Sequence, residues 1–165
     1  MVTATTTAWA AAAGTPDPEL PMLTLADLGI LRDVHETAGV VIATITPTYS
    51  GCPAMREIAA DLRDRLQRAG YRDVEIRTQL APAWSSDWIT DEGRRKLTRA
   101  GIAPPTGAPR RTGPVALTLG RPTPAACPRC GSGNTTLTAA FSSTACKSLH
   151  RCADCAEPFE SIKAI

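Results

Sequence analysis

The hydrophobic pattern of residues 24 to 100 predicts alternating helices and strands. Apolar residues recur at near-helical spacing from Thr24 to Val34, after a Thr and an Asp that suit a helix start. The apolar, β-branched run at 39–45 is typical of a buried strand. Residues 54–69 place an apolar stripe opposite charged pairs one turn apart, which predicts a long amphipathic helix. Alternation at 74–80 predicts a strand with one buried face, and 91–100 adds a short helix.

This order places a helix between two strands. Two strands that are connected through a helix usually pair side by side in parallel, with a right-handed crossover. We therefore predict an α+β fold, in which a small domain of layered helices and strands has its helices on one face of the sheet. A second, much smaller β domain is predicted to follow it in the sequence.

Proline marks the boundary between the two predicted domains. Residues 102–126 are rich in proline and glycine, a composition that resists both helices and central strands. This segment is predicted to be a linker between a domain at 16–101 and a domain at 127–165. The Ala- and Thr-rich residues 1–15 contain no Lys or Arg, unlike the start of a signal or transit peptide, and are predicted to be a disordered leader.

Composition narrows the range of functions. The chain of 165 residues has a formal net charge of +2 with scattered Lys and Arg, which does not indicate a nucleic-acid partner. It has no apolar stretch long enough to cross a membrane. Neither His35 nor His150 lies beside a recognisable nucleophile or carboxylate motif, so no catalytic residue is predicted. We expect a cytoplasmic protein that is not an enzyme.

Two CxxC pairs near the C-terminal end carry the strongest chemical signal. Cys127 and Cys130 form the first pair, and Cys152 and Cys155 form the second. This spacing is typical of a four-thiolate zinc ribbon, in which each pair projects two sulfurs from one tight turn. Two disulfides are the alternative, but paired thiols in a reducing cytosol bind metal instead. We predict a structural Zn(II) site that supplies much of the folding free energy of residues 127–165.

Two other residues near these pairs have less certain roles. Cys146 lies six positions before Cys152 and could be a spare ligand, a redox thiol or a packed residue. His150 is a minor alternative to one of the cysteine ligands. Both rank below the four CxxC sulfurs, because four thiolates already complete a structural zinc site.

Cys52 is the only cysteine before the CxxC pairs. Pro53 suits the first turn of a helix, so Cys52 is predicted to be the N-cap residue, near unpaired backbone N–H groups and the positive end of the helix dipole. These features favour a thiolate. Such a thiolate can act as a nucleophile, as a redox thiol, or as a ligand for a soft metal or an iron–sulfur cluster. The alternative is a small buried residue.

Several segments of the chain resemble known families. Three of them resemble the domain of iron–sulfur assembly factors of the SufT type: 16–21, 27–32 and 46–54. Four more resemble the PaaD family, whose members form the D component of the phenylacetyl-CoA epoxidase system: 82–88, 101–105, 143–147 and 157–159. The resemblance covers about residues 16 to 165. Members of the family often carry a cysteine where this chain has Ala164, which argues against an indispensable metal ligand there.

The resemblance implies a non-catalytic maturation factor in aerobic phenylacetate catabolism, beside a di-iron oxygenase and its flavin and iron–sulfur reductase subunit. Cys52 becomes the candidate ligand of a transient iron–sulfur cluster or of iron, and Asp17 and Glu19 become its candidate neighbours. The epoxidase components, first among them the reductase subunit, become the expected partners. A homodimer is a further expectation, because a cluster shared between two Cys52 thiolates would need two copies.

Two other function classes stay open at this point. The first is a zinc-stabilised structural adaptor that recruits epoxidase subunits without handling a cluster. The second is a thiol redox enzyme or a nucleic-acid-binding ribbon. This second class is disfavoured, because both CxxC pairs are better used on zinc and the ribbon offers few aromatic residues for base stacking.

Overall fold

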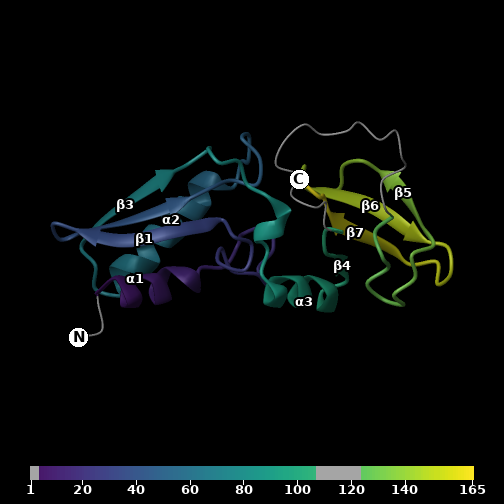
Figure 1. Cartoon of the computed structure of the whole chain (residues 1–165), viewed down its shortest axis with the longest axis horizontal. Helices are drawn as coiled ribbons and strands as arrows, with labels where there is room; N and C mark the ends of the chain where they lie inside the picture. The colour runs from purple at the N-terminus through teal and green to yellow at the C-terminus, as the bar shows by residue number, and fades with distance from the viewer. Residues whose placement is uncertain (1–3, 107–123) are drawn as a thin grey trace. The chain divides into compact units, whose positions relative to one another are not determined.

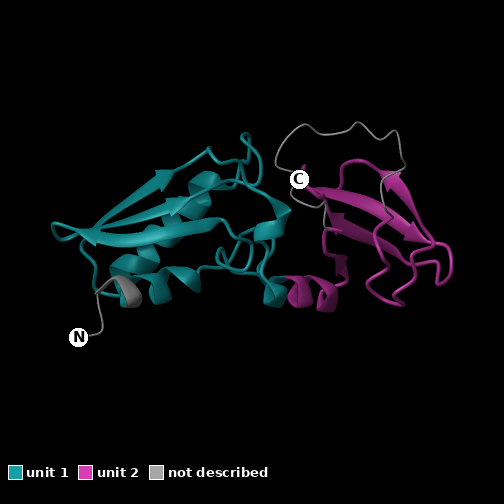
Figure 2. Ribbon diagram, in the orientation of Figure 1, with its two compact units in different colours: residues 1–93 teal, residues 94–165 magenta. Residues whose placement is uncertain are grey.

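A computed structural model describes residues 4–106 and 124–165 of the chain. Contacts divide the chain into two compact units, residues 1–93 and 94–165 (Figure 2). The division falls inside helix α3 (Asp91–Arg99), eight residues before the predicted boundary at residue 101. Most of the predicted linker at 102–126 lies outside the described residues. No helix in the described part of the chain combines the length and the apolarity needed to cross a bilayer.

The first unit is built on a three-stranded sheet in the order β1-β2-β3. Strand β1 (Leu31–Thr37) and strand β2 (Val40–Ile45) form an antiparallel hairpin. Its two-residue turn has positive φ at both Ala38 (52°) and Gly39 (81°), as the tightest hairpin turns require. The strand predicted at 39–45 is confirmed, whereas β1 was not predicted as a strand.

Helix α2 (Met55–Arg68) connects β2 to β3 (Asp73–Thr78). Strands β2 and β3 pair in parallel, and their arrowheads point the same way in Figure 1. The parallel crossover and the amphipathic helix are therefore confirmed. The apolar stripe of α2 is buried in the core of this unit and consists of Ile58, Leu62 and Leu66.

The helix predicted from Thr24 to Val34 was wrong. The predicted cap does form: the Asp27 N–H donates to Thr24 Oγ1 (3.1 Å), and the Thr24 N–H donates to Asp27 Oδ2 (2.9 Å). The chain then leaves the helical path at Gly29, which has a φ of +67°, and continues into β1. The capping hydrogen bonds therefore form around a single turn rather than a helix. The residues that follow adopt an extended conformation because they pair with β2.

The disordered leader predicted for residues 1–15 was wrong from residue 4 onward, because Ala4–Ala13 form helix α1, and residues 1–3 lie outside the described residues. Ala8 and Ala12, one turn apart, are completely buried, and α1 contacts both β1 and α2. Arg65 Nε donates to the carbonyl oxygen of Ala11 (2.9 Å), near the end of α1. Alanine is the strongest helix former, and its small side chain permits close packing. Both helices therefore lie on one face of the sheet, as predicted.

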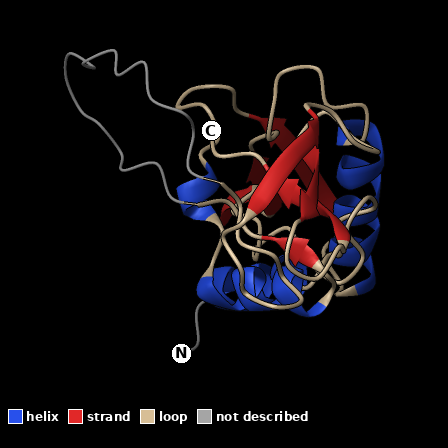
Figure 3. Ribbon diagram, turned by 90° about the vertical axis from the view of Figure 1, so that its right-hand side faces the viewer, coloured by secondary structure: helices blue, strands red, loops and turns tan. Residues whose placement is uncertain are grey.

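A loop that includes the short 3-10 helix η1 (Ser86–Trp88) joins β3 to α3 and carries two tryptophans; helices are blue and loops are tan in Figure 3. Trp84 is buried, and its indole N–H donates to the Leu28 carbonyl (2.9 Å). Trp88 is half-buried, with the Arg32 guanidinium 3.6 Å from its ring centre. The two side chains hold this loop against the turn that precedes β1.

We expect Gly29→Ala to destabilise the first unit by about 3 kcal/mol and Gly39→Ala by about 1 kcal/mol. Both glycines have positive φ, 67° and 81°, so both substitutions carry backbone strain. A Cβ at residue 29 would also lie 2.5 Å from Trp88 Cβ, whereas nothing lies within 4 Å at residue 39. Urea unfolding followed by circular dichroism measures both losses. Equal losses would contradict the steric part of this argument.

The second unit contains a four-stranded sheet in the order β4-β7-β6-β5. Its strands are β4 (Ile102–Ala103), β5 (Thr135–Ala139), β6 (Lys147–Cys152) and β7 (Pro158–Ile162). Strand β4 pairs in parallel with β7, and the other neighbours are antiparallel. The start of the predicted linker is thus a strand of this sheet. The described residues confirm the α+β class.

The buried cluster around the cysteines is small in the described part of the second unit. It contains Ala103, Ala125 and Phe159 besides Cys127 and Cys152. Two of the four candidate metal ligands are therefore also core residues. So few apolar side chains rarely stabilise a domain of this size without a metal or another cross-link.

Candidate functional site

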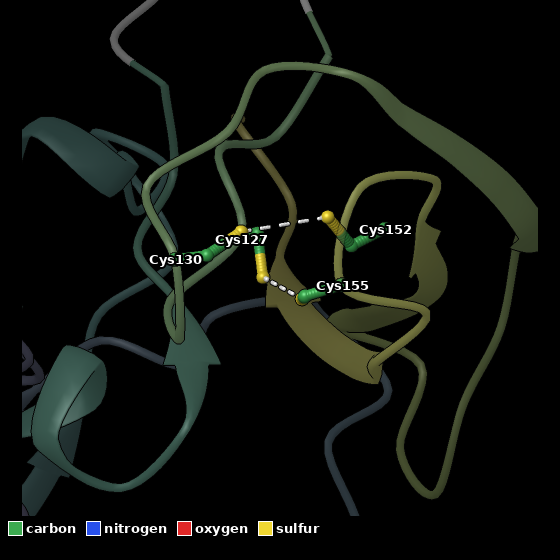
Figure 4. A group of neighbouring side chains, drawn as sticks. All are labelled: Cys127, Cys130, Cys152 and Cys155. Atoms are coloured by element: carbon green, nitrogen blue, oxygen red, sulfur yellow. Dashed lines mark hydrogen bonds between the residues drawn. The ribbon is translucent and has the colours of Figure 1, made fainter.

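The four CxxC cysteines come together at one point of the second unit (Figure 4). All four sulfurs lie within 4.8 Å of one another. The Cys127 and Cys155 sulfurs are 3.7 Å apart, and those of Cys130 and Cys152 are 3.6 Å apart. Sulfurs bound tetrahedrally to one zinc ion at about 2.3 Å would be separated by about 3.8 Å. The donor set and its spacing therefore fit one tetrahedral metal ion.

Each CxxC pair lies on a tight turn next to the sheet. In the first turn the Gly131 N–H donates to the Cys127 carbonyl (2.8 Å), and Gly131 has a φ of +77° that favours glycine. In the second, Cys152 ends β6 and its N–H donates to the Glu157 carbonyl (2.9 Å). The backbone thus directs two sulfurs from each turn toward the other pair.

Side chains from the two turns also bind each other directly. Arg129, inside the first CxxC, forms an ion pair with Glu157, just after the second. Asp154, inside the second CxxC, accepts hydrogen bonds from Ser132 Oγ (2.5 Å) and Asn134 Nδ2 (2.8 Å). These two hydrogen bonds hold the pKa of the Asp154 carboxyl below its usual range. The turns are therefore linked by polar contacts as well as by their shared sulfur cluster.

The four thiols differ in burial and acidity. Cys127 and Cys152 are buried, Cys155 is half-buried, and Cys130 is exposed. Backbone N–H groups, first that of Cys155, lower the pKa of Cys152 to about 7. The Ser132 N–H favours the Cys130 thiolate, but contacts with the other cysteines outweigh it and raise the pKa of Cys130 to about 12. Four crowded thiols therefore ionise together only when a cation is shared among them.

Cys146 and His150 lie outside this group of sulfurs. The Cys146 sulfur is 3.1 Å from Thr144 Oγ1, in the loop between β5 and β6. His150 Nε2 is 3.0 Å from Ser148 Oγ, and its ring stacks on Phe159 with a centroid distance of 5.5 Å. The geometry thus gathers the four CxxC residues and neither of the two additional candidates.

Cys52 lies in the turn before α2, and its predicted place as the N-cap was wrong. The N-cap residue is Ala54, which has helical dihedral angles and makes no side-chain capping hydrogen bond. The Cys52 N–H donates to the Tyr49 carbonyl (3.2 Å), and the side chain is half-buried. An extra turn through Pro53 and Ala54 therefore separates the thiol from the first helical residue.

One end of the first sheet gathers the segments that carry the other candidate residues. Leu31 pairs with Ile45, so the chain before β1 and the chain after β2 meet at the same end. The Thr46 N–H donates to the Ile30 carbonyl (2.9 Å), which joins these two segments directly. Leu25 connects Ile30 to the Asp17 segment. Its carbonyl accepts a hydrogen bond from the Ile30 N–H, and its own N–H donates to the Thr15 carbonyl. These hydrogen bonds connect the Asp17 segment to Thr46, from which the chain continues toward Cys52.

Asp17 is buried and Glu19 is half-buried. Asp17 Oδ1 accepts hydrogen bonds from the backbone N–H groups of Glu19 and Leu20, both at 2.9 Å. This carboxylate therefore holds the conformation of its own turn, in addition to any role toward a ligand. The Glu19 side chain is positioned through that turn.

Thr46 is a residue at this end that the sequence analysis missed. Its side chain is 1 % exposed, and Oγ1 has no hydrogen-bond partner among the described residues. A buried hydroxyl without a partner costs about 1–3 kcal/mol, so such an atom marks a place where a ligand or water can bind. The sequence feature that could have indicated Thr46 is its position directly after β2, in the segment that leads to Cys52.

Glu160 holds the loop between β5 and β6. Its Oε1 accepts from Ser142 Oγ (2.5 Å) and Ser143 Oγ (2.9 Å), and its Oε2 accepts from Lys147 Nζ (2.8 Å). Burial alone would raise the pKa of Glu160, but these donors, first Lys147, lower it to about 2. The Lys147 side chain is only 6 % exposed, so this is a largely buried ion pair.

We expect Glu160→Gln to destabilise the second unit by about 3 kcal/mol at pH 7, because Lys147 would keep a buried charge without its counter-ion. A carboxylate with a lowered pKa stabilises the fold above its unfolded pKa, near 4.5, and loses that effect as the pH falls toward 2. The loss should therefore be constant from pH 8 to about pH 5. Urea unfolding of the zinc-loaded protein measures it, with Glu157→Gln, in the exposed pair with Arg129, as the control. A difference that shrinks between pH 8 and 6 would contradict the pKa argument.

Comparison with known proteins covers almost the whole chain. The family described as PaaD zinc beta ribbon domain matches residues 111–163, and the family described as iron-sulfur cluster assembly protein matches residues 6–77. A protein of Escherichia coli (strain K12), named as the D component of a "Putative 1,2-phenylacetyl-CoA epoxidase", is 41% identical over 157 residues. This alignment covers 95% of the present chain and 91% of the relative.

Two more similarities cover about half of the chain each. A protein of Porphyromonas gingivalis (strain ATCC BAA-308 / W83) named "Fe-S protein maturation auxiliary factor" is 34% identical over 83 residues, 49% of this chain and 78% of the relative. The crystal structure of a domain of unknown function, DUF59, from Bacillus anthracis superposes with a TM-score of 0.53. It is 24% identical and covers 56% of this chain and 90% of its own, so it bears on the fold alone.

Proposed function

The chain belongs to the PaaD family, and from this membership we propose that it is a non-catalytic maturation factor of the phenylacetyl-CoA epoxidase system in aerobic phenylacetate catabolism. It assists the assembly of an iron–sulfur cluster or its transfer to the flavin and iron–sulfur reductase subunit. The observation that carries the proposal is the alignment of 95% of the chain with a protein named as a component of that epoxidase. The match of residues 6–77 to an iron–sulfur cluster assembly family supports the same role.

In this proposal Cys127, Cys130, Cys152 and Cys155 hold one structural zinc ion. Four thiolates fill the tetrahedral shell of zinc and leave no open position for a substrate, which is typical of a structural site. The ion would neutralise the repulsion among the four thiolates and cross-link the two turns of the second unit. Cys146 is left out of the ligand set, because its sulfur lies outside the group of four.

Cys52 is proposed as the ligand of the cargo, a transient iron–sulfur cluster or iron. A single protein thiolate leaves the other coordination positions for a recipient's cysteines or for a second copy of the chain. Transfer then requires only ligand exchange, in which the bond from iron to Cys52 breaks as a bond to a recipient thiolate forms. A homodimer is required only if two Cys52 thiolates share one cluster.

The proposed neighbours of Cys52 are Asp17 and Glu19, with Thr46 added from the structure. In support, backbone hydrogen bonds connect the Asp17 segment to Thr46, which precedes the Cys52 loop. Asp17 would act by fixing the turn that carries Glu19, since its Oδ1 binds two backbone N–H groups there. The buried Thr46 hydroxyl would donate to an acceptor on the cargo or to a bound water.

The second candidate function is a zinc-stabilised adaptor that recruits epoxidase subunits without handling a cluster. It is favoured by the exposed aromatic side chain of Phe141 in the second unit. The two candidates differ in one measurable quantity, the iron and acid-labile sulfide content of the reductase subunit. That content should fall when the reductase is produced without this chain. An equal content with and without the chain would overturn the maturation role and leave the adaptor.

A further inference from the structure

We propose that the loop between β5 and β6, together with Lys163, is the surface through which this chain binds a protein component of the epoxidase system. We call it the hairpin patch and define it by Phe141, Ala145, Cys146 and Lys163. The matching surface of the partner carries a carboxylate beside an apolar side chain. The identity of the partner rests on the proposed function, whereas the surface itself is independent of Cys52.

Phe141 provides the apolar part of the hairpin patch. Its side chain is 67 % exposed, the largest exposed fraction among the big hydrophobic residues of the described chain. Aromatic side chains are enriched at the centre of protein interfaces, where they bury a large area at a small entropic cost.

Lys163 provides the charge. Its Nζ lies 3.9 Å from the centre of the Phe141 ring and donates to the Ala145 carbonyl (2.7 Å). Its backbone N–H donates to the Cys146 carbonyl (3.0 Å). No carboxylate in the described part of the chain lies within ion-pair distance of this ammonium group. The positive charge is therefore fixed beside an apolar ring and is complementary to an acidic group on another molecule.

Polar contacts hold the loop of the hairpin patch. Glu160 ties down the same loop through Ser142, Ser143 and Lys147. Removing both charges of the pair from water is costly, and a buried ion pair is weak evidence for stability alone. Here the pair ties the end of this exposed loop to β7. A preorganised surface loses less entropy on binding, which is an advantage for a docking site.

The proposal is tested with the full zinc-loaded chain and separately purified epoxidase components, immobilised one at a time. We expect Phe141→Ala to raise Kd at least about 30-fold and Lys163→Gln to raise it about 10-fold. Lys163→Gln should also remove most of the salt dependence of binding. Leu137→Ala is the matched control, because Leu137 is 53 % exposed on the same hairpin and should change Kd less than about twofold.

Cys146 gives a second readout that needs no substitution in the hairpin patch. Its half-buried thiol lies in the loop, outside the group of four metal-binding sulfurs. A bound partner should slow the alkylation of Cys146 by iodoacetamide, as measured by peptide mass mapping. Cys52 is alkylated in the same reaction and reports on the other unit. Unchanged alkylation of Cys146 in a saturated complex would overturn the proposal.

The remaining outcomes are equally decisive. The proposal fails if no component binds the wild type, if Phe141→Ala binds normally, or if Leu137→Ala loses as much affinity. Displacement of the partner by a single-stranded oligonucleotide would identify a nucleic-acid surface instead. Cys52→Ser should bind like the wild type. If the wild type docks normally through the hairpin patch but does not mature the reductase, the docking surface stands and the proposed function fails. If no component docks but the reductase is still matured, the docking surface fails and the proposed function stands.

Discussion

Cys127→Ser should abolish metal binding and unfold the second unit, whereas Cys146→Ser should leave both the metal and the fold unchanged. Cys127 is one of four sulfurs within 4.8 Å of one another, and it is also part of the small buried cluster of that unit. Zinc binding contributes about 10–16 kcal/mol to the folding of small zinc domains, more than so small a core can replace. This is the largest effect expected from any single substitution in the chain.

Zinc content and limited proteolysis test this expectation on the purified full-length variants. The wild type and Cys146→Ser should bind one zinc ion per chain and protect residues 124–165 from protease. Cys127→Ser should lose the metal and expose this region, while the first unit keeps its own cooperative unfolding transition. Full zinc content in Cys127→Ser, or metal loss in Cys146→Ser, would show that the ligand set is assigned incorrectly.

Cys52→Ser should remove the ability to carry an iron–sulfur cluster while leaving zinc in place. Cys52 is the only cysteine of the first unit, so no second thiol of that unit can replace it. A serine hydroxyl is a poor ligand for iron–sulfur clusters, which are held by thiolates. We expect the visible absorption and the acid-labile sulfide of the reconstituted protein to fall to background, at unchanged zinc content.

The measurement is anaerobic reconstitution with iron and sulfide, followed by transfer to the apo-reductase. Cys146→Ser is the matched control, because Cys146 is also a half-buried cysteine outside the group of four. A chromophore that survives in Cys52→Ser but disappears in Cys146→Ser would move the cargo site to the second unit. A chromophore that appears in no variant would favour the adaptor.

Hydrophobic periodicity predicted the correct conformation where one helix or strand accounts for the whole pattern. The stripe of Ile58, Leu62 and Leu66 predicted α2, and the alternation that follows predicted β3, which is paired in parallel with β2. The same reasoning failed from Thr24 to Val34, where a genuine cap motif precedes only one turn. Periodicity cannot distinguish a helix from a turn plus a strand when the strand partner lies elsewhere in the sequence.

The misassigned leader has a similar cause. Residues 4–13 read as low-complexity alanine and threonine, yet Ala8 and Ala12 are buried against the first unit and Arg65 binds the end of the helix. Small side chains carry no amphipathic signal that reveals such a contact. A helix of this kind becomes visible only when the surface that it packs on is known.

The sequence by itself determined which residues can bind metal, because the CxxC spacing positions two sulfurs on one turn without help from the rest of the fold. It also determined that Cys52 is the one thiol of the first unit. Only the tertiary structure decided that all four sulfurs meet, that Cys146 and His150 stay apart from them, and that Thr46 is buried without a partner among the described residues. It also placed Lys163 over Phe141 and tied their loop to Glu160. These relations join residues far apart in sequence, so the packing of the sheets, rather than local spacing, decides them.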